Sequence, residues 1–284
     1  MASMREIKRR KESIQNTSQI TAAMKVVSTA KLQKAKGRVE ASKPYFHYMH
    51  DAVTSILAKS DNVDHPYLQS NNSKKIAVIV VSSNRGLAGG YNNNVVKLLT
   101  QGDMEKEDVF VYAVGRKGRD SLKRNGYEIK ADFSEVMNEP LFSDAVDIGR
   151  AVLEAYAKGE IGKIYIAYTV FKNTITQIPT LTQLLPVAVE VGEKKADDLV
   201  LMNYEPNAEE ALDKIIPKYV NSMIYGALCE ALASENGARM QAMDSASNNA
   251  EEMIADLSLK YNRARQASIT QELTEIVAGA SAIE

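Results

Sequence analysis

The sequence contains one cysteine, no tryptophan and no long apolar run, and the first and last of these shortages each exclude a structural feature. The single Cys229 excludes an intrachain disulfide, and its Ala- and Leu-rich surroundings favour a packing role over a catalytic one. The longest unbroken apolar run, residues 76–81, is much too short to span a bilayer. Few residues are aromatic and many are Ala or Met, which is typical of helical proteins. We therefore expect a soluble chain from a reducing compartment.

Charge is distributed unevenly, although the formal net charge of the whole chain is only −1. This near-neutral balance indicates neither a nucleic-acid partner nor an acidic membrane surface. Residues 1–43 carry 11 Lys and Arg against 3 Asp and Glu, whereas residues 208–284 carry 6 against 12. The two ends thus have net charges of +8 and −6. We expect them to attract each other along their lengths.

Proline is absent from the first 43 residues and from the last 67, which favours a long helix at each end. Small or apolar residues recur near a heptad spacing in the N-terminal segment, with three further apolar residues between them: Ile7, Ile14, Thr21, Ser28 and Ala35, then Ile20, Met24 and Leu32. The C-terminal segment has a similar series: Met223, Ala227, Ala231, Ala238, Ala242 and Met253. We predict that the two segments pair as an antiparallel coiled coil; two ordinary bundle helices are the alternative.

Between the ends, β-branched and aromatic runs alternate with helical segments, which predicts an α/β sheet. Strands are expected at 76–81, 109–114 and 163–170, and helices near 91–100, 115–124 and 143–158. Residues 176–189 predict one or two further strands, with Pro179 and Pro186 favouring the edge of the sheet. The predicted division is an N-terminal coiled-coil helix, a linker, an α/β domain and a C-terminal coiled-coil helix, at residues 1–58, 59–75, 76–207 and 208–284.

The loop after the first predicted strand, residues 82–90, contains three glycines and raises the question of a phosphate site. The spacing of Gly86, Gly89 and Gly90 does not fit G-x-G-x-x-G, and the chain has no P-loop motif. We interpret the loop as a tight strand-to-helix turn, with Ser82, Ser83 or Asn84 capping the helix that follows. A stand-alone α/β nucleotide-binding enzyme with helical extensions is the alternative function.

Other candidates for chemistry are weaker. His47 and His50 lie three residues apart on an expected helix and have no third ligand, which is typical of solvated surface histidines. The basic cluster at residues 8–11 favours solubility or partner docking over phosphate binding. The sequence therefore predicts no catalytic residue, no metal and no cofactor.

Residues 5–35 and 261–282 resemble the gamma subunit of the F-type ATP synthase. The second stretch is the more specific, because it fits the pattern I-T-x-E-x-x-[DE]-x-x-x-G-A through Ile269, Thr270, Glu272, Glu275, Gly279 and Ala280. The resemblance covers the whole chain. It implies a Rossmann-like α/β domain without a nucleotide, inserted between two long terminal helices that form an antiparallel coiled coil.

The resemblance also implies a function, the central rotor shaft of a proton-translocating ATP synthase. Such a shaft has no catalytic activity of its own and couples ion flow to ATP synthesis or hydrolysis by rotation. Its implied partners are three alpha and three beta subunits around one gamma, the epsilon subunit and the c-ring. It would lie peripherally at the cytoplasmic face of the cell membrane, without inserting into it and without binding nucleic acid. A coiled-coil scaffold unrelated to ATP synthesis is a further alternative.

Several residues receive roles from the resemblance. Met24 and Lys25 are expected near the acidic lever of the beta subunit, and Arg239 and Gln266 among the upper contacts. The polar C-terminal tip is expected to offer hydrogen bonds or torque contacts to surrounding loops through Arg265, Gln266, Thr270, Glu272 and Glu275. Tyr204 and Glu205, in NYEPN, resemble the segment that rests on the c-ring; a helix-start turn capped by Asn207 is the alternative there.

Overall fold

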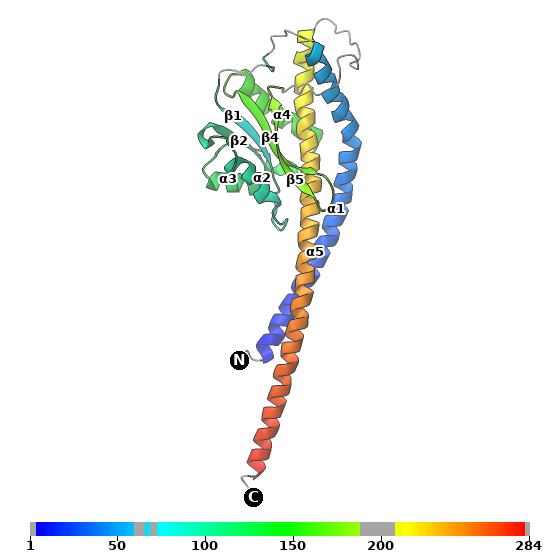
Figure 1. The fold of residues 1–284 in the computed structure, drawn as a ribbon, viewed down its shortest axis with the longest axis vertical. Coiled ribbons are helices and arrows are strands. Elements are labelled where there is room, and N and C mark those ends of the chain that lie inside the picture. Colours follow the sequence, from blue (N-terminus) through cyan, green and yellow to red (C-terminus); the bar gives the residue numbers. More distant parts are fainter. Residues whose placement is uncertain (1–3, 60–65, 69–72, 188–207, 282–284) are drawn as a thin grey trace. The chain divides into compact units, whose positions relative to one another are not determined.

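The computed structural model describes residues 4–59, 66–68, 73–187 and 208–281, and most of its helices and strands are labelled in Figure 1. The chain divides into two compact units. The coiled-coil unit comprises residues 1–28 and 240–284, and the sheet unit comprises residues 29–239. Two long helices, α1 (Met4–Lys59) and α5 (Ala208–Ser281), contribute residues to both units.

The sheet unit is built on five strands in the order β3-β2-β1-β4-β5 (Figure 1). They are β1 (Ile76–Val81), β2 (Val109–Val114), β3 (Glu128–Asp132), β4 (Lys163–Phe171) and β5 (Gln177–Leu185). Strands β1 to β4 run parallel, with Ile76 of β1 opposite Val109 of β2 and Lys163 of β4. Strand β5 is antiparallel to β4 and forms one edge of the sheet. The predicted Rossmann-like α/β class and the edge position are confirmed.

Helices cover both faces of this sheet because alternate residues of each buried strand point to opposite sides. On one face, Ile79 and Val81 of β1 share an apolar cluster with Ile148 of α4 (Phe142–Ala157) and with α5. On the other face, Val78 and Val80 share a cluster with α2 (Tyr91–Thr100) and α3 (Arg116–Arg124). Two short 3-10 helices, Lys106–Asp108 and Ser134–Asn138, lie in the connections. The sheet unit is thus a three-layer sandwich.

Within this unit, α5 is a core helix. Its fully buried side chains recur every four residues, at Leu212, Ile216, Val220, Ile224 and Leu228. Helix α1 adds Val53 to the same cluster. The two helices approach closely at Gly226, where an added Cβ would lie 3.0 Å from the ring of Phe46. Glycine at that position therefore allows the aromatic side chain to pack on the helix backbone.

Strand β3 is the element that the sequence analysis missed. Its five residues, EIKAD, carry three charges and alternate between exposed and half-buried side chains. Such a strand has no apolar run to signal it, because it is the second edge of the sheet and only one of its faces is covered. The strands expected at 76–81 and 109–114 are confirmed with the same bounds, and the third extends to Phe171.

In the coiled-coil unit, α1 and α5 run antiparallel. The Oγ1 atom of Thr21 lies 2.8 Å from the Oγ atom of Ser247, and Nζ of Lys25 lies 2.6 Å from Oδ1 of Asp244. Since residue numbers rise along one helix as they fall along the other, the directions are opposite. The predicted antiparallel pairing of the terminal segments is confirmed.

The seam between these helices differs in part from the predicted one. Ser28 of α1 and four residues of α5 are buried there: Met243, Ser247, Ala250 and Leu257. Ile20 and Met253, which the heptad pattern assigned to the seam, are 60% and 54% exposed. That assignment was wrong because a helix turns once every 3.6 residues, so apolar residues one position from the contact line face solvent. The observed seam therefore mixes small residues with two larger ones, Met243 and Leu257.

Helix α5 continues beyond its partner. The register of Thr21 with Ser247 places the start of α1, at Met4, opposite residues near Ala264. The remaining turns, up to Ser281, form a single helix about 25 Å long, at about 1.5 Å per residue. Every residue from Gln271 to Gly279 is exposed. We call residues 265–281 the overhang.

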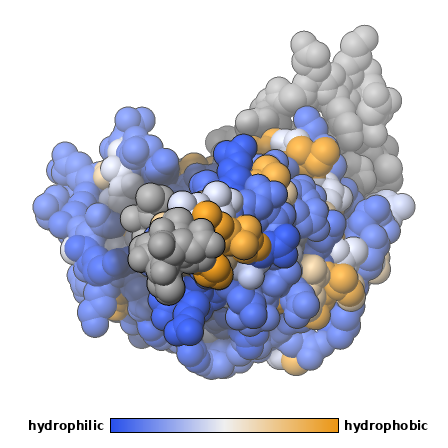
Figure 2. Space-filling model, turned by 90° about the horizontal axis from the view of Figure 1, so that it is seen from below, coloured by the Kyte–Doolittle hydropathy of each residue, from blue (hydrophilic) through white to orange (hydrophobic). Residues whose placement is uncertain are grey.

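The surface seen from below is mostly hydrophilic, with separate apolar patches (Figure 2). The apolar side chains exposed on the overhang are Ile269, Leu273, Ile276 and Val277. Among the residues that the structure describes, no helix is both long enough and apolar enough to cross a membrane.

Candidate functional site

The loop of residues 82–90, which we call the glycine loop, lies where open α/β sheets hold ligands. Such sheets bind them beyond the carboxyl ends of the strands, at the point where strand order reverses. Here the order reverses at β1, since β2 lies on one side of it and β4 on the other. The glycine loop follows β1 directly. A nucleotide bound to this domain would therefore be expected at the glycine loop.

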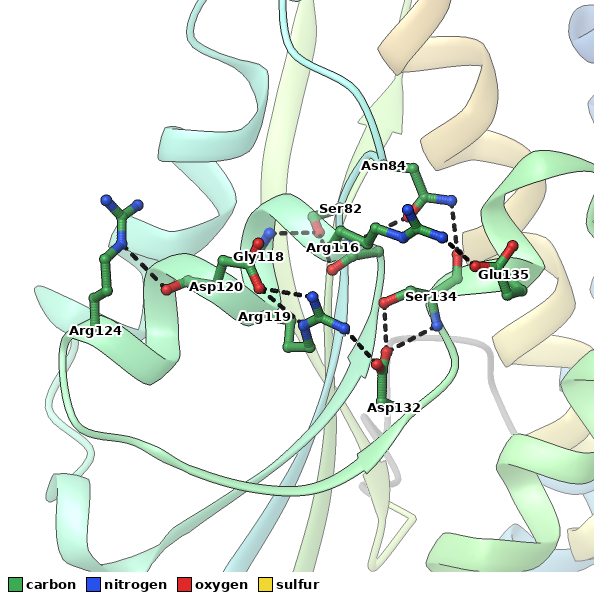
Figure 3. A network of polar contacts seen from close by, with 11 residues as sticks. Ser82, Asn84, Arg116, Gly118, Arg119, Asp120, Arg124, Asp132, Ser134 and Glu135 are labelled. Atoms are coloured by element: carbon green, nitrogen blue, oxygen red, sulfur yellow. Dashed lines mark hydrogen bonds and ion pairs between the residues drawn. The ribbon is translucent and has the colours of Figure 1, made fainter.

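The glycine loop caps a helix, but not the one that follows it. The Oγ atom of Ser82 accepts a hydrogen bond from the backbone N–H of Gly118 at 2.9 Å, and Oδ1 of Asn84 accepts one from the N–H of Arg116 at 3.0 Å (Figure 3). The N–H of Lys117 donates to the carbonyl oxygen of Ser83 at 3.0 Å. The predicted capping of the following helix was wrong: α2 begins at Tyr91, and its N-cap residue, Gly90, provides no side-chain cap. The first N–H groups of α3, which could bind an anion, are already occupied.

Two glycines permit this close approach, Gly115 directly before α3 and Gly118 in its first turn. Gly115 has φ of 113°, and a Cβ there would lie 2.0 Å from the carbonyl oxygen of Ser82. A Cβ on Gly118 would lie 2.6 Å from Oγ of Ser82. In a dinucleotide-binding domain, glycines at such positions bring backbone close to a pyrophosphate. In this chain they bring α3 close to the end of β1.

A network of ion pairs surrounds the start of α3 (Figure 3). Arg119 lies 2.5 Å from Asp132 and 2.8 Å from Asp120, and Arg116 pairs with Glu135. Burial alone would raise the pKa of Asp132, but hydrogen bonds from Ser134 and Arg119 outweigh it and hold the pKa below its usual value of 3.8. A hollow in the surface is lined by several of these residues, including Arg116 and Arg119. Both arginines are therefore neutralised by carboxylates of the chain itself.

Helix α5 packs against the other side of the glycine loop. The hydroxyl of Tyr91 donates to the carbonyl oxygen of Ala231 at 3.1 Å. The hydroxyl of Ser234 donates to the backbone carbonyl oxygen of Thr169 in β4 at 3.0 Å. Burial raises the pKa of the Tyr91 hydroxyl well above its usual value. These contacts place α5 against β4 and the first turn of α2, beside the switch point of the sheet. A helix of the same chain thus packs beside the switch point.

One turn further along α5 is a nearly buried ion pair. Nη2 of Arg239 lies 2.6 Å from Oε1 of Glu235, and their side chains are only 11% and 9% exposed. Burial raises the pKa of the Glu235 carboxyl, and the Arg239 charge opposes part of that rise. The Nε and Nη2 atoms of Arg239 also lie 3.4 Å from the carbonyl oxygen of Gly86. The guanidinium therefore joins α5 to the glycine loop.

Comparisons with known proteins identify the family that has this arrangement. The family model for ATP synthase matches residues 3–283. An ATP synthase gamma chain of Lachnoclostridium phytofermentans is 66% identical over 290 residues, with 100% of both chains covered. The chain belongs to the family of ATP synthase gamma chains.

Other relatives extend this result. A chain of Acetobacterium woodii described as "ATP synthase gamma chain, sodium ion specific" is 40% identical, covering 99% of this chain and 98% of its own. A chain in the Euglena gracilis mitochondrial ATP synthase has the same fold, with a TM-score of 0.70, 18% identity and coverage of 99% and 94%. The predicted function, a rotor subunit of ATP synthase without catalytic activity of its own, is confirmed by membership of this family. No comparison supports the nucleotide-binding enzyme.

The structure separates the residues that the sequence analysis singled out. In the coiled-coil unit, Met24 is half-buried and Lys25 is paired with Asp244. The five polar tip residues, Arg265, Gln266, Thr270, Glu272 and Glu275, are all exposed. Arg239 belongs to the sheet unit. Tyr204 and Glu205 lie outside the described residues, as do the side chains of His47 and His50. The partner contacts assigned to these residues stay predictions, as does the domain division.

Sequence reasoning missed the intrachain partners of these residues. Glu235 precedes Arg239 by four positions, a spacing that places opposite charges side by side on a helix, so this pair could have been found. Asp244 could not be assigned to Lys25, because the two residues are 219 positions apart and their pairing depends on the register of two helices.

Proposed function

We propose that this gamma chain turns as the shaft inside a ring of three alpha and three beta subunits. The epsilon subunit and the c-ring would hold its other end, at the cytoplasmic face of the membrane. Support comes from family membership over the full length and from the structure of the coiled-coil unit. Rotation requires a stiff element whose surface is not locked to one neighbour. A paired helix with a mixed polar and apolar surface, continued by an exposed overhang, fits that requirement.

The coupling follows from asymmetry. A single shaft inside a ring with threefold repetition cannot present the same face to all three beta subunits at once. Each beta subunit therefore meets different contacts and favours a different conformation. Turning the shaft changes which conformation each one favours, and by reciprocity nucleotide turnover in the ring turns the shaft.

A rotation assay tests the proposal and can use the cysteine content of the chain. Because Cys229 is buried, a Lys158→Cys variant adds one exposed thiol at the end of α4, to which a bead can be attached. We expect ATP to drive stepwise rotation of the bead in a complex that contains alpha, beta and gamma chains in the ratio 3:3:1. The parent chain should take up no bead. ATP hydrolysis by the complex with a stationary bead would contradict the proposal.

The overhang is proposed to contact loops of the ring. Gln266 is exposed on a helix without a partner, so its amide is available for hydrogen bonds to another chain. Such bonds are worth about 1–3 kcal/mol where one partner is charged, enough to favour an angle without trapping the rotor. Gln266→Leu should lengthen the rotational dwells while assembly is retained. Dwell times equal to those of the parent would leave the overhang as a passive bearing.

Met24 and Lys25 are proposed to face the acidic lever of the beta subunit. Asp244 already offsets the charge of Lys25, so Met24→Lys would add a cation that has no such partner at its own position. We expect weaker coupling of ATP hydrolysis to ion pumping, because the new charge attracts the lever at only some angles. Unchanged ATP-driven pumping in an assembled variant complex would contradict this role.

Docking to the c-ring is proposed for Tyr204 and Glu205, which lie outside the described residues. This proposal depends on the resemblance of NYEPN to the docking segment of the family. Replacing both residues with Ala should weaken attachment to the membrane sector and leave the ATPase activity of the detached complex unchanged. Full retention of coupled synthesis would exclude the role.

A further inference from the structure

The glycine loop exposes an unusual residue at its tip. Leu87 has φ of 63°, a backbone conformation that a bulky side chain rarely adopts, and its side chain is 62% exposed. A strained residue persists only where its surroundings hold it in place. Leu87 gains no burial in the chain that would offset the strain. The contacts that hold the loop must therefore come from its neighbours.

Those contacts hold the glycine loop on two sides. On the side of the sheet, the N–H of Ser83 donates to Oδ1 of Asn92 at 2.9 Å, and the amide of Asn84 donates to the carbonyl oxygen of Ser134 at 2.7 Å. On the side of α5, the guanidinium of Arg239 reaches the carbonyl oxygen of Gly86, the residue directly before Leu87. Within the part of the chain that the structure describes, Arg239 supplies the hydrogen bonds that join residues 85–87 to α5.

Arg239 can reach Gly86 because Glu235 orients it. The carboxylate lies one turn earlier on the same helix and accepts from Nη2 at 2.6 Å, so the planar guanidinium is fixed with its remaining N–H groups toward the loop. Lys31 of α1 and Arg85 of the loop also bear electrostatically on Glu235. Burial raises the pKa of the Glu235 carboxyl, and the positive charges of Arg239, Lys31 and Arg85 oppose part of that rise.

We infer that Arg239 is a positioning residue, which with Glu235 clamps the glycine loop to α5 and so holds Leu87 in its strained conformation. The effect expected on pumping rests on the proposed function, but the clamp itself lies entirely within the sheet unit. It gives Arg239 a different role from the direct partner contact that the family resemblance implied. At 11% exposure, the side chain acts through the loop.

The first test measures the loop itself. Hydrogen exchange of the backbone amides of residues 84–90 is followed in the full chain and in its complex with alpha and beta. Removing a local tether raises the exchange of the segment that it holds, and we expect about a tenfold increase for Arg239→Gln. Arg239→Lys should keep the ion pair with Glu235 but lose the hydrogen bonds to the carbonyl oxygen of Gly86. Amide exchange in the loop should therefore be as fast as in Arg239→Gln. The control Arg150→Gln removes an exposed pair with Asp147 and should change nothing there.

The second test is a double-mutant cycle on ATP-driven pumping. Arg239→Gln and Leu87→Ala should each reduce the pumping rate several-fold per ATP hydrolysed, and the double variant should be no worse than either single one, because both act through one loop. Additive losses, or a loss in Arg239→Gln without faster loop exchange, would show that Arg239 contacts a neighbour directly and would overturn the inference. If the parent complex itself showed no rotation, the proposed function would fail instead, and the exchange result would still decide the clamp.

Discussion

Helix α5 is built in two different ways along its length. In the sheet unit it buries a row of large aliphatic side chains, from Leu212 to Leu228, against the sheet and α4. In the coiled-coil unit it buries fewer residues, the small Ser247 and Ala250 beside Met243 and Leu257, and the overhang buries none of its described side chains fully. The first segment is helical because a core requires it. The second must depend on its own helix propensity and on one partner, since small residues bury little area.

This difference suits two mechanical tasks. The segment in the sheet unit must not move relative to the sheet, and a continuous apolar core prevents that. In the proposed shaft, the segment in the coiled-coil unit would have to remain straight while the surfaces of successive ring subunits pass it. Large apolar contacts there would favour one arrangement by several kcal/mol, at about 25 cal/mol per Å² of buried apolar area.

The largest effect should come from a leucine of the core. Leu228→Ala removes a fully buried side chain and should lower the free energy of unfolding by about 2–5 kcal/mol, because it leaves a cavity. Leu259→Ala is the matched control on the same helix, where the side chain is 59% exposed, and should change it by less than about 0.5 kcal/mol. Urea unfolding of the purified chain measures both. Equal losses would mean that the two segments are not built differently.

A backbone change at the sheet should have the next largest effect. Gly115→Ala forces a side chain into a left-handed conformation and against the carbonyl oxygen of Ser82. We expect a loss of about 1–3 kcal/mol in stability. Gly159→Ala is the control, because that glycine also has positive φ, of 73°, but open space around it. Gly159→Ala should lower the stability by less than Gly115→Ala does, and thermal unfolding of both variants measures the difference. A loss in Gly159→Ala as large as that in Gly115→Ala would show that the steric contact with Ser82 contributes nothing.

Breaking the coiled-coil pair should have a smaller effect. The side chains of Lys25 and Asp244 are 45% and 47% exposed, so their pairing should contribute only about 0.2–1 kcal/mol. Lys25→Asp and Asp244→Lys should each destabilise the unit by like-charge repulsion, and the double variant should recover most of the loss. Failure of the double variant to recover would show that the register is set elsewhere, for example by Thr21 and Ser247.

The smallest expected effect is a response to acid confined to the sheet unit. Because the folded pKa of Asp132 lies below its usual value of 3.8, the stabilisation is present above that value and is lost as pH falls through the lowered pKa. Asp132→Asn should therefore make unfolding of the sheet unit less dependent on pH below about 4. Acid titration followed by circular dichroism measures this. If the stability of the parent and that of the variant fell in parallel with pH, the prediction would be wrong.

Much of the fold could be predicted because its signals are local. Proline-free ends, complementary charge and a small-residue spacing indicated the paired helices, and apolar runs indicated β1, β2 and β4. Strand β3 escaped because an edge strand with one covered face needs few apolar residues. The role of Ser82 and Asn84 escaped because they cap α3, a helix more than 30 residues away that only the parallel sheet brings beside them.

The site could be predicted only in outline. The motif at the C-terminus identified the family and the residues of the overhang, because that segment is a continuous helix whose exposed face can be read from the sequence. The neighbours of Arg239 could not be read in the same way. Its contact with Gly86 joins residues 153 positions apart and depends on how α5 crosses the sheet.

The overhang of α5 has a consequence for elasticity. Two helices that are joined along a seam resist twisting and bending together, whereas a lone helix must resist on its own. We expect residues 265–281 to be the most compliant part of the coiled-coil unit, and to yield before the paired turns do when a load is applied to the tip. A rotor with a soft end can store part of each step as strain and release it smoothly, so that an abrupt event at one end need not be an abrupt event at the other.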